Sequence, residues 1–262
     1  GSVLFVHSYT TSNNKYDAKG IYTIRSFDGN NWFSLDTVDV NGRNGNLVNI
    51  GNSKDLIVYH DSTENSNDIF FRLSTDTGIS WSDRTHLVGG INSQKNARGI
   101  KDQFDKIWVF FEDEEQTSFN GLRQPDINFI TSTDEGNSWS NKQKFTTYTG
   151  IDDNLALSIW NGKPILTFSS SRSFSLQNQK MQLYYGVGGE TIDANGPPYL
   201  FKHSIIPEPI TQQEPVTFRA WVLDDTGVDS VFVIARLNEL AGEHRQMFDD
   251  GLHNDSLTGD NI

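Results

Sequence analysis

The chain has 262 residues, with 34 acidic against 21 basic side chains and a formal net charge of −13. This acidic balance argues against binding to nucleic acid phosphates, which requires clustered lysine and arginine. No apolar stretch is long enough to span a bilayer, and the lack of cysteine excludes disulfides, thiolate metal ligands and a cysteine nucleophile.

Short apolar runs separated by turn residues recur along the chain, without a long helical periodicity. Three of these runs, LIVY (56–59), IWVFF (107–111) and ILTF (165–168), are apolar at nearly every position. Continuous apolar runs are typical of strands that are covered on both faces. The sequence therefore predicts an all-β fold in which neighbouring sheets pack on each other.

An internal repeat divides the first 204 residues into four units. The segment DIFFRLSTDTGISWS (68–82) aligns without a gap with DINFITSTDEGNSWS (126–140), and weaker copies lie at 20–32 and 181–189. The copy at 20–32 is one residue shorter between its aspartate and its glycine. Repeats of about fifty residues, each with four antiparallel strands, are typical of propeller blades.

The repeated S-x-D-x-G-x-x-W turn contains residue types with separate tasks. Its aspartates can accept backbone N–H bonds, its glycines can adopt positive φ, and its tryptophans can bury a large ring between sheets. The pattern resembles the Asp-box, or BNR repeat, of the sialidase superfamily of β-propellers. We expect a structural role for the residues of the two full copies: Ser74, Asp76, Gly78, Trp81, Ser132, Asp134, Gly136 and Trp139.

The resemblance implies a ligand site on the face opposite these turns, built by the loops between strands and between blades. We expect the acidic run at 112–115 to be a solvated part of these loops, and His60 to be a packing or surface residue. In the sialidase family three arginines clamp a sugar carboxylate, a task that suits the planar guanidinium group. The residues predicted to contact a ligand are Arg43, Arg98, Arg123, Arg172, Asp61 and Asp153.

The resemblance also implies a tyrosine nucleophile assisted by a glutamate, with an aspartate as acid/base. The segment that holds the family's first arginine does not occur here, and Tyr184 is expected to pack between blades. We therefore expect a secreted or cell-surface protein that binds glycan or extracellular protein and acts as a scaffold, without turnover. The alternative is an exo-α-sialidase that removes terminal sialic acids from glycans.

Four units are fewer than the six blades that the resemblance implies for a complete propeller. We expect the remaining blades to come from upstream sequence or from a partner chain, because an open arc would expose sheet faces and strand edges. The acidic, cysteine-free composition suits bacterial export.

The composition changes after residue 204, where residues 205–215 contain three prolines and predict a linker. Alternating apolar residues from 216 onward predict strands of a β-sandwich, and the closing stretch resembles immunoglobulin-like modules of bacterial surface proteins. The predicted organisation is a sialidase-like propeller at 1–204, a linker at 205–215 and a partial immunoglobulin-like module at 216–262.

Oxygen-bearing side chains are concentrated near the end of the sequence, at Asp249, Asp250, Asn254, Asp255 and Asp260. Such hard oxygens are the ligands that Ca²⁺ prefers. The same residue types also form Asx turns in hairpin connections. Both interpretations remain open from the sequence, and neither function hypothesis requires a cofactor.

Overall fold

The computed structural model describes residues 3–9, 19–33, 35–63, 66–116, 123–172, 180–190, 199–207, 215–223, 228–235, 243–249 and 252. Every regular element in these ranges is a β-strand, which confirms the all-β prediction. Within the same ranges, no helix is long and apolar enough to cross a membrane. The chain divides into two compact units, the first formed by residues 1–147, 152–169 and 183–192, and the second by residues 148–151, 170–182 and 193–262.

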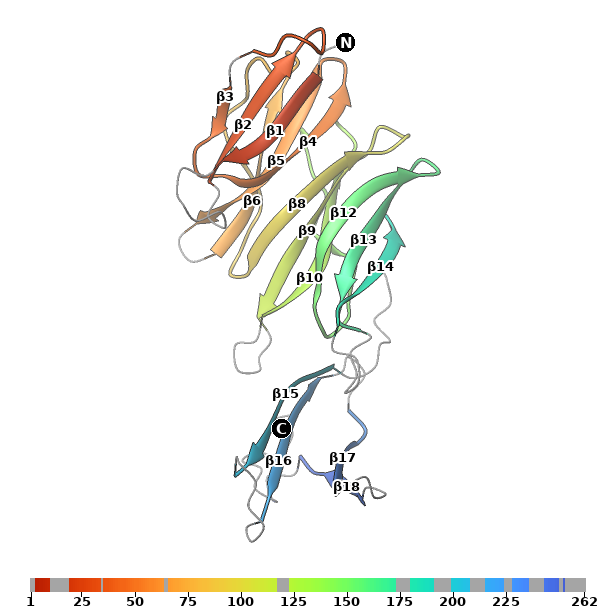
Figure 1. Ribbon diagram of the computed structural model, residues 1–262. Coiled ribbons are helices and arrows are strands. Elements are labelled where there is room, and N and C mark those ends of the chain that lie inside the picture. Colours follow the sequence, from red (N-terminus) through yellow and green to blue (C-terminus); the bar gives the residue numbers. More distant parts are fainter. Residues whose placement is uncertain are drawn as a thin grey trace. The chain divides into compact units, whose positions relative to one another are not determined.

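Four antiparallel sheets follow one another in chain order (Figure 1). The first contains β1 (Val3–Tyr9), β2 (Lys19–Ser26) and β3 (Asp36–Asp39), and the second contains β4 (Arg43–Gly51), β5 (Lys54–Thr63), β6 (Ser66–Ser74) and β7 (Thr85–Val88). The third contains β8 (Ser93–Lys101), β9 (Ile107–Gln116), β10 (Arg123–Ser132) and β11 (Gln143–Lys144), and the fourth contains β12 (Asp152–Trp160), β13 (Lys163–Ser170) and β14 (Gln182–Val187). Two of the four repeats thus have the expected four strands, and the other two have three within the described residues.

Alternate residues of the central strands face different neighbours. In β5, Leu56 and Val58 belong to the apolar cluster between the second and third sheets, whereas Ile57 and Tyr59 belong to the cluster between the first and second. In β9, Val109 and Phe111 likewise belong to the cluster between the second and third sheets, whereas Trp108 and Phe110 belong to the cluster between the third and fourth. The apolar runs at 56–59 and 107–111 are therefore covered on both faces, as their sequences predict.

The repeated turn closes on its own serine and aspartate. Ser74 Oγ donates to Asp76 Oδ1 and accepts the Gly78 N–H, both at 2.8 Å. Asp76 Oδ1 also accepts the backbone N–H groups of Ile79 and Ser80, at 3.0 and 2.9 Å. The second full copy has the corresponding serine, aspartate and glycine contacts at Ser132, Asp134 and Gly136. These contacts satisfy backbone donors that the turn would otherwise leave unpaired.

Two consecutive residues of each full turn have positive φ. The angles are 61° and 76° at Thr77 and Gly78, and 59° and 88° at Glu135 and Gly136. In the shorter copy Gly29 has a φ of 79°. Since this copy has one residue fewer between aspartate and glycine, it lacks the position that Thr77 and Glu135 occupy, and the serine–glycine contact is kept at 2.8 Å.

The turn aspartates predict a loss of stability in acid. Hydrogen bonds from the Ser138 hydroxyl and backbone N–H lower the pKa of Asp134 to about 2. A carboxylate whose folded pKa lies below its unfolded value of about 4 stabilises the fold above that value, and this contribution disappears as the pH falls from about 4 to about 2. We expect the urea midpoint of the Asp134→Asn variant to be lower at pH 7 and to change less between pH 5 and 3 than that of the parent. Parallel pH dependences for the two proteins would contradict this assignment.

The second unit contains two short antiparallel sheets. One pairs β15 (Tyr199–Ile206) with β16 (Thr217–Leu223), and the other pairs β17 (Val231–Ala235) with β18 (Glu243–Met247). Ile205 and Ile206 pair with Phe218 and Thr217, so the first two residues of the expected linker belong to β15. The sequence predicted a linker here because proline is rare inside strands, although the apolar pair before the first proline continues the β15–β16 pairing.

Candidate ligand-binding site

The first strand of each of three sheets contains an asparagine in the left-handed conformation. Asn44 in β4, Asn96 in β8 and Asn154 in β12 have φ angles of 51°, 54° and 55°. The strand pairing skips residues at Asn44 and Asn96, so both lie in β-bulges, and asparagine tolerates this backbone conformation better than most residues. Figure 1 shows β4, β8 and β12 in neighbouring sheets, with β8 against both of the others. Because each asparagine lies near the start of its strand, the three lie at one end of these sheets.

One buried acceptor in each of two sheets binds the asparagine of the next sheet. The Asn96 N–H donates to His60 Nδ1 at 3.3 Å, and the Asn154 N–H donates to Glu112 Oε1 at 2.8 Å. His60 in β5 and Glu112 in β9 are only 6% and 2% exposed. Buried side chains of the preceding sheet therefore fix the Asn96 and Asn154 backbones by hydrogen bonds to their N–H groups.

The asparagine side chains extend this network across the sheets. Asn44 Nδ2 donates to Asn96 Oδ1 at 2.6 Å, and Asn96 Nδ2 donates to Glu112 Oε2 at 2.7 Å. Asn154 Nδ2 donates to Asp153 Oδ1 at 2.7 Å. A polar row thus runs from the second sheet to the fourth.

Three cations accompany the asparagines. Arg43 lies opposite His60 in the β4–β5 register, and Lys95 forms an ion pair with Glu114. Arg98 Nη1 donates to the backbone oxygens of Ala97 at 2.9 Å and Asn44 at 3.5 Å. Among the described residues, no carboxylate oxygen lies within 4 Å of the Arg98 guanidinium group. Its other nitrogens are therefore available to an acceptor from outside.

Burial and charge shift the pKa values of this cluster. Burial, followed by Arg43, Lys95 and Arg98, lowers the pKa of His60 to about 4, so the ring is neutral at pH 7. Its Nδ1 accepts the Asn96 N–H, which places the ring proton on Nε2. Burial raises the pKa of Glu112 and that of Asp153.

The structure brings together three of the residues predicted to contact a ligand. Arg98 reaches the backbone of Asn44, which follows Arg43 directly, and Asp153 precedes the Asn154 whose N–H is bound by Glu112. The strand register pairs Arg43 with His60 at one end of β5, and Asp55 with Ser74 at the other. The repeated turns therefore lie at the opposite end of the strands from this cluster.

Asp61 is occupied by an ion pair within its own sheet. Arg84 Nη1 donates to Asp61 Oδ2 at 2.6 Å, and the guanidinium carbon of Arg84 lies 3.7 Å from the centroid of the Phe70 ring. In the third sheet, Lys142 forms an ion pair with the buried Asp113. Arg84 and Lys142 each come three residues after the tryptophan of a repeated turn. We therefore assign Asp61 to a repeated structural ion pair and not to the ligand cluster.

Two further arginines are not placed with this cluster. Arg172 belongs to the second unit, where its Nε donates to Ser170 Oγ at 2.9 Å and its guanidinium carbon lies 5.2 Å from the Tyr148 ring centroid. Arg123 pairs with Gln116 in the β9–β10 register, but its side chain lies outside the described residues.

The expectation of a solvated acidic loop at 112–115 is wrong. These residues continue β9, and Glu112 and Asp113 are 2% and 0% exposed. Partners on neighbouring strands make this burial possible, among them Asn96 for Glu112 and Gln94 for Asp113. Tyr184 packs on Phe168 with ring centroids 6.2 Å apart, which confirms its predicted packing role.

None of the three asparagines was among the residues predicted to contact a ligand, and His60 was expected to be a packing or surface residue. A signal was present, since each asparagine follows a charged residue at the start of a first strand: Arg43-Asn44, Lys95-Asn96 and Asp153-Asn154. The spacing differs between copies, so an alignment anchored on the repeated turns does not superimpose these pairs. Their common backbone conformation became evident only in the fold.

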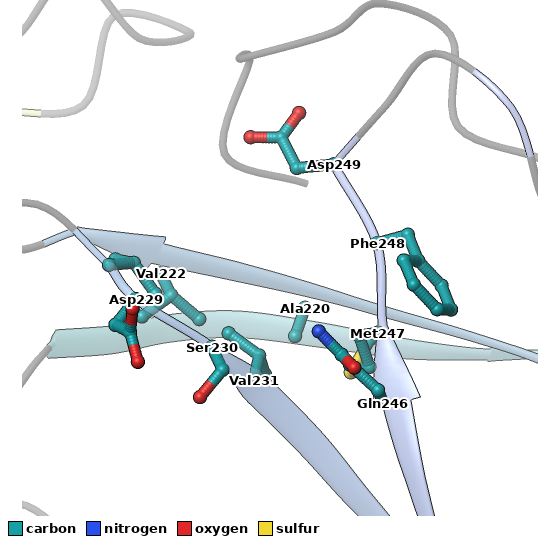
Figure 2. Close-up of a pocket in the computed structure, with 10 residues that line it drawn as sticks. Ala220, Val222, Asp229, Ser230, Val231, Gln246, Met247, Phe248 and Asp249 are labelled. Carbon is teal, nitrogen blue, oxygen red and sulfur yellow. The ribbon is translucent and has the colours of Figure 1, made fainter.

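The second unit contains a cavity of about 290 Å³ between β16, β17 and β18, with both polar and apolar residues in its lining. Ala220, Val222, Val231 and Met247 line it, and Figure 2 shows the Asp249 carboxylate pointing away from Ala220 and Met247. Asp250, Asn254, Asp255 and Asp260 lie outside the described residues, within which no cluster of His, Asp or Glu is arranged to hold a metal ion. Calcium binding at these five residues stays a prediction.

No protein-family model and no curated protein sequence matches the chain. Several solved structures resemble it. A Hadza microbial sialidase aligns at a TM-score of 0.51 and 11% identity over 71% of this chain and 42% of its own. An α-L-arabinanase of Penicillium chrysogenum, solved with arabinobiose, aligns at a TM-score of 0.51 and 15% identity over 72% of this chain and 60% of its own. A PL25 ulvan lyase aligns at a TM-score of 0.53 and 15% identity over 74% of this chain and 55% of its own.

These similarities show the fold, which is that of sialidase-like and arabinanase-like β-propeller proteins. The chain spans between 42% and 60% of the length of these structures. Because unrelated chemistries share this architecture, the function has to be argued from the residues of the site.

Proposed function

We propose that this protein binds acidic carbohydrate at the end of the first unit where Asn44, Asn96 and Asn154 lie, and that it acts outside the cell as a binding and scaffolding protein. The observation that supports this most is Arg98, whose guanidinium group contacts two backbone carbonyls but no carboxylate in the described chain. A guanidinium fork with free N–H groups suits a sugar carboxylate. Arg43 adds a second positive charge to the same region.

Calorimetric titration with glucuronate and with sialic acid tests this proposal. We expect Arg98→Gln to weaken binding by roughly tenfold or more, because a hydrogen bond to a charged group contributes about 1.5–3 kcal/mol. Lys54→Gln is the matched control, since it removes the same charge at the turn end of β5, where Lys54 pairs with Glu135. Equal losses in the two variants, or unchanged binding in Arg98→Gln, would contradict the proposed site.

Exo-sialidase activity is the second candidate and has its own readout. Release of a fluorescent phenol from an α-sialoside by the parent protein, lost in Arg98→Gln, would replace the binding role with hydrolysis. Binding without release supports the scaffolding role, and an extracellular protein ligand would be indicated if neither sugar binds.

We further propose that the second unit is an immunoglobulin-like spacer. Its two antiparallel sheets border a common cavity, and the facing layers of a sandwich are arranged in this way. The proposal extends to export to the bacterial surface, and to further blades supplied by upstream sequence or by a partner chain.

A further inference from the structure

The hydrogen bonds that connect Asn44, Asn96 and Glu112 all run in one direction, from amide N–H donor to oxygen acceptor. A primary amide donates through its nitrogen and accepts through its oxygen, so the group at one end of the row fixes every amide that follows. Glu112 Oε2 accepts from Asn96 Nδ2, which turns Asn96 Oδ1 toward Asn44 Nδ2. Asn44 is exposed, and no described residue binds its Oδ1. The row therefore ends on an acceptor at the surface.

The direction of these hydrogen bonds depends on whether the Glu112 carboxyl group is protonated. Its Oε1 always accepts, because its partner is the backbone N–H of Asn154 at 2.8 Å. Since Oε1 is held by the Asn154 N–H, a proton on the carboxyl group then lies on Oε2, whose O–H becomes a donor that finds its acceptor in Asn96 Oδ1 once that amide turns. Asn96 would present its oxygen to Glu112 and its nitrogen to Asn44, and Asn44 would in turn reverse.

We infer that Glu112, Asn96 and Asn44 form a hydrogen-bond relay in which a proton taken from solvent by the buried carboxyl group reverses both amides. Asn44 then presents an N–H donor to a ligand in place of an oxygen acceptor. Glu112 is thus a positioning residue that acts on the ligand through two amides. The part of this inference that concerns ligands rests on the proposed carbohydrate site.

The surroundings of Glu112 allow both protonation states. Burial and the nearby Asp153 on β12 favour the neutral form, whereas Lys95 on β8 and the hydrogen bonds from Asn96 and Asn154 favour the charged form. Arg98 on β8 also interacts with Glu112. His60 on β5 binds the Asn96 backbone and is neutral down to about pH 4, so it adds no charge while Glu112 titrates above that pH.

The relay changes which sugar group is favoured near Arg98. With Glu112 charged, Asn44 Oδ1 accepts a hydrogen bond from a sugar hydroxyl. With Glu112 neutral, Asn44 Nδ2 donates to a carboxylate or an acetamido oxygen. Acidic and N-acetylated sugars should therefore gain affinity as Glu112 takes up a proton.

Side-chain amide NMR of the ¹⁵N-asparagine-labelled protein tests the relay without any ligand. We expect the Asn44 and Asn96 side-chain signals to titrate together in the parent protein, with one apparent pKa. Through-bond correlations from each side-chain amide to its own backbone assign the signals in the parent protein. Titration of one signal without the other, or of neither between pH 8 and 4, would overturn the relay even if no variant folds.

Glu112→Gln provides the second test, because its amide oxygen can accept from Asn154 while its NH₂ donates to Asn96, as the neutral acid does. At pH 7 its Asn44 signal should match that of the parent at low pH and should not titrate. We expect this variant to bind glucuronate roughly tenfold more tightly than the parent at pH 7, as one gained hydrogen bond to a charged group implies.

Glu135→Gln is the control, since it removes the same charge at the turn end of the strands, where Glu135 pairs with Lys54. An equal gain in Glu135→Gln would show a general charge effect and overturn the specific role of Glu112. Failure of glucuronate to bind any of these proteins, with coupled titration of the two amides, would leave the relay standing and reject the proposed ligand.

Discussion

Asp113→Ala is expected to lower the free energy of unfolding by about 3–5 kcal/mol, the range found when one partner of a buried ion pair is removed. Asp113 is fully buried and accepts from Gln94 Nε2 at 2.9 Å and Asn128 Nδ2 at 3.0 Å, and Lys142 pairs with the same carboxylate. Removal of the carboxylate leaves three donors on β8, β10 and the segment before β11 without their acceptor. Urea unfolding followed by tryptophan fluorescence measures the loss.

The neighbouring Glu114→Ala variant is the control for Asp113→Ala. Glu114 pairs with Lys95, and both side chains are partly exposed, whereas the Asp113 side chain is fully buried. Ion pairs near the surface contribute about 0–1 kcal/mol. The two variants should therefore differ by at least about 2 kcal/mol. Similar small losses in both would mean that the Asp113 network does not hold the third sheet together.

Phe110→Ala is expected to cost about 3–5 kcal/mol, because it removes a large buried ring from the cluster between the third and fourth sheets. Phe110 is 0% exposed, and its ring centroid lies 5.4 Å from that of Phe129 and 5.5 Å from that of Phe145. Phe104→Ala, at a position that is 72% exposed, serves as the matched control. A urea midpoint for Phe110→Ala no lower than that for Phe104→Ala would contradict this packing.

Much of the fold was predictable because each repeat contains, within a short stretch of sequence, the residues that determine its strands and its turn. The apolar runs at 56–59 and 107–111 already require cover on both faces, and the serine, aspartate and glycine of each full turn predict a closed, positive-φ connection. The residue of positive φ before each glycine, Thr77 or Glu135, was not predictable from its side chain. The end of β15 was also missed, because prolines nearby suggested a linker.

The site was only partly predictable, because its residues act across sheets. Arg43, Arg98 and Asp153 could be proposed from their position between repeats. Glu112 could not be distinguished from an ordinary surface glutamate, since its burial depends on an asparagine from its own sheet and a backbone N–H from the next. Asp61 was proposed as a ligand residue from its place after the apolar run at 56–59, and its pairing with Arg84, 23 positions further along the chain, is not evident from the sequence.

A ¹H–¹⁵N backbone titration of the intact protein with glucuronate tests the proposed carbohydrate site most directly. Binding at this site predicts chemical-shift changes at Arg43 to Asn46, His60, Lys95 to Arg98 and Asp153 to Leu155, with the repeated turns at Ser74 to Gly78 and Ser132 to Gly136 unaffected. Changes confined to those turns or to the second unit, or no changes at saturating sugar, would contradict a carbohydrate site at the asparagine end of the first unit.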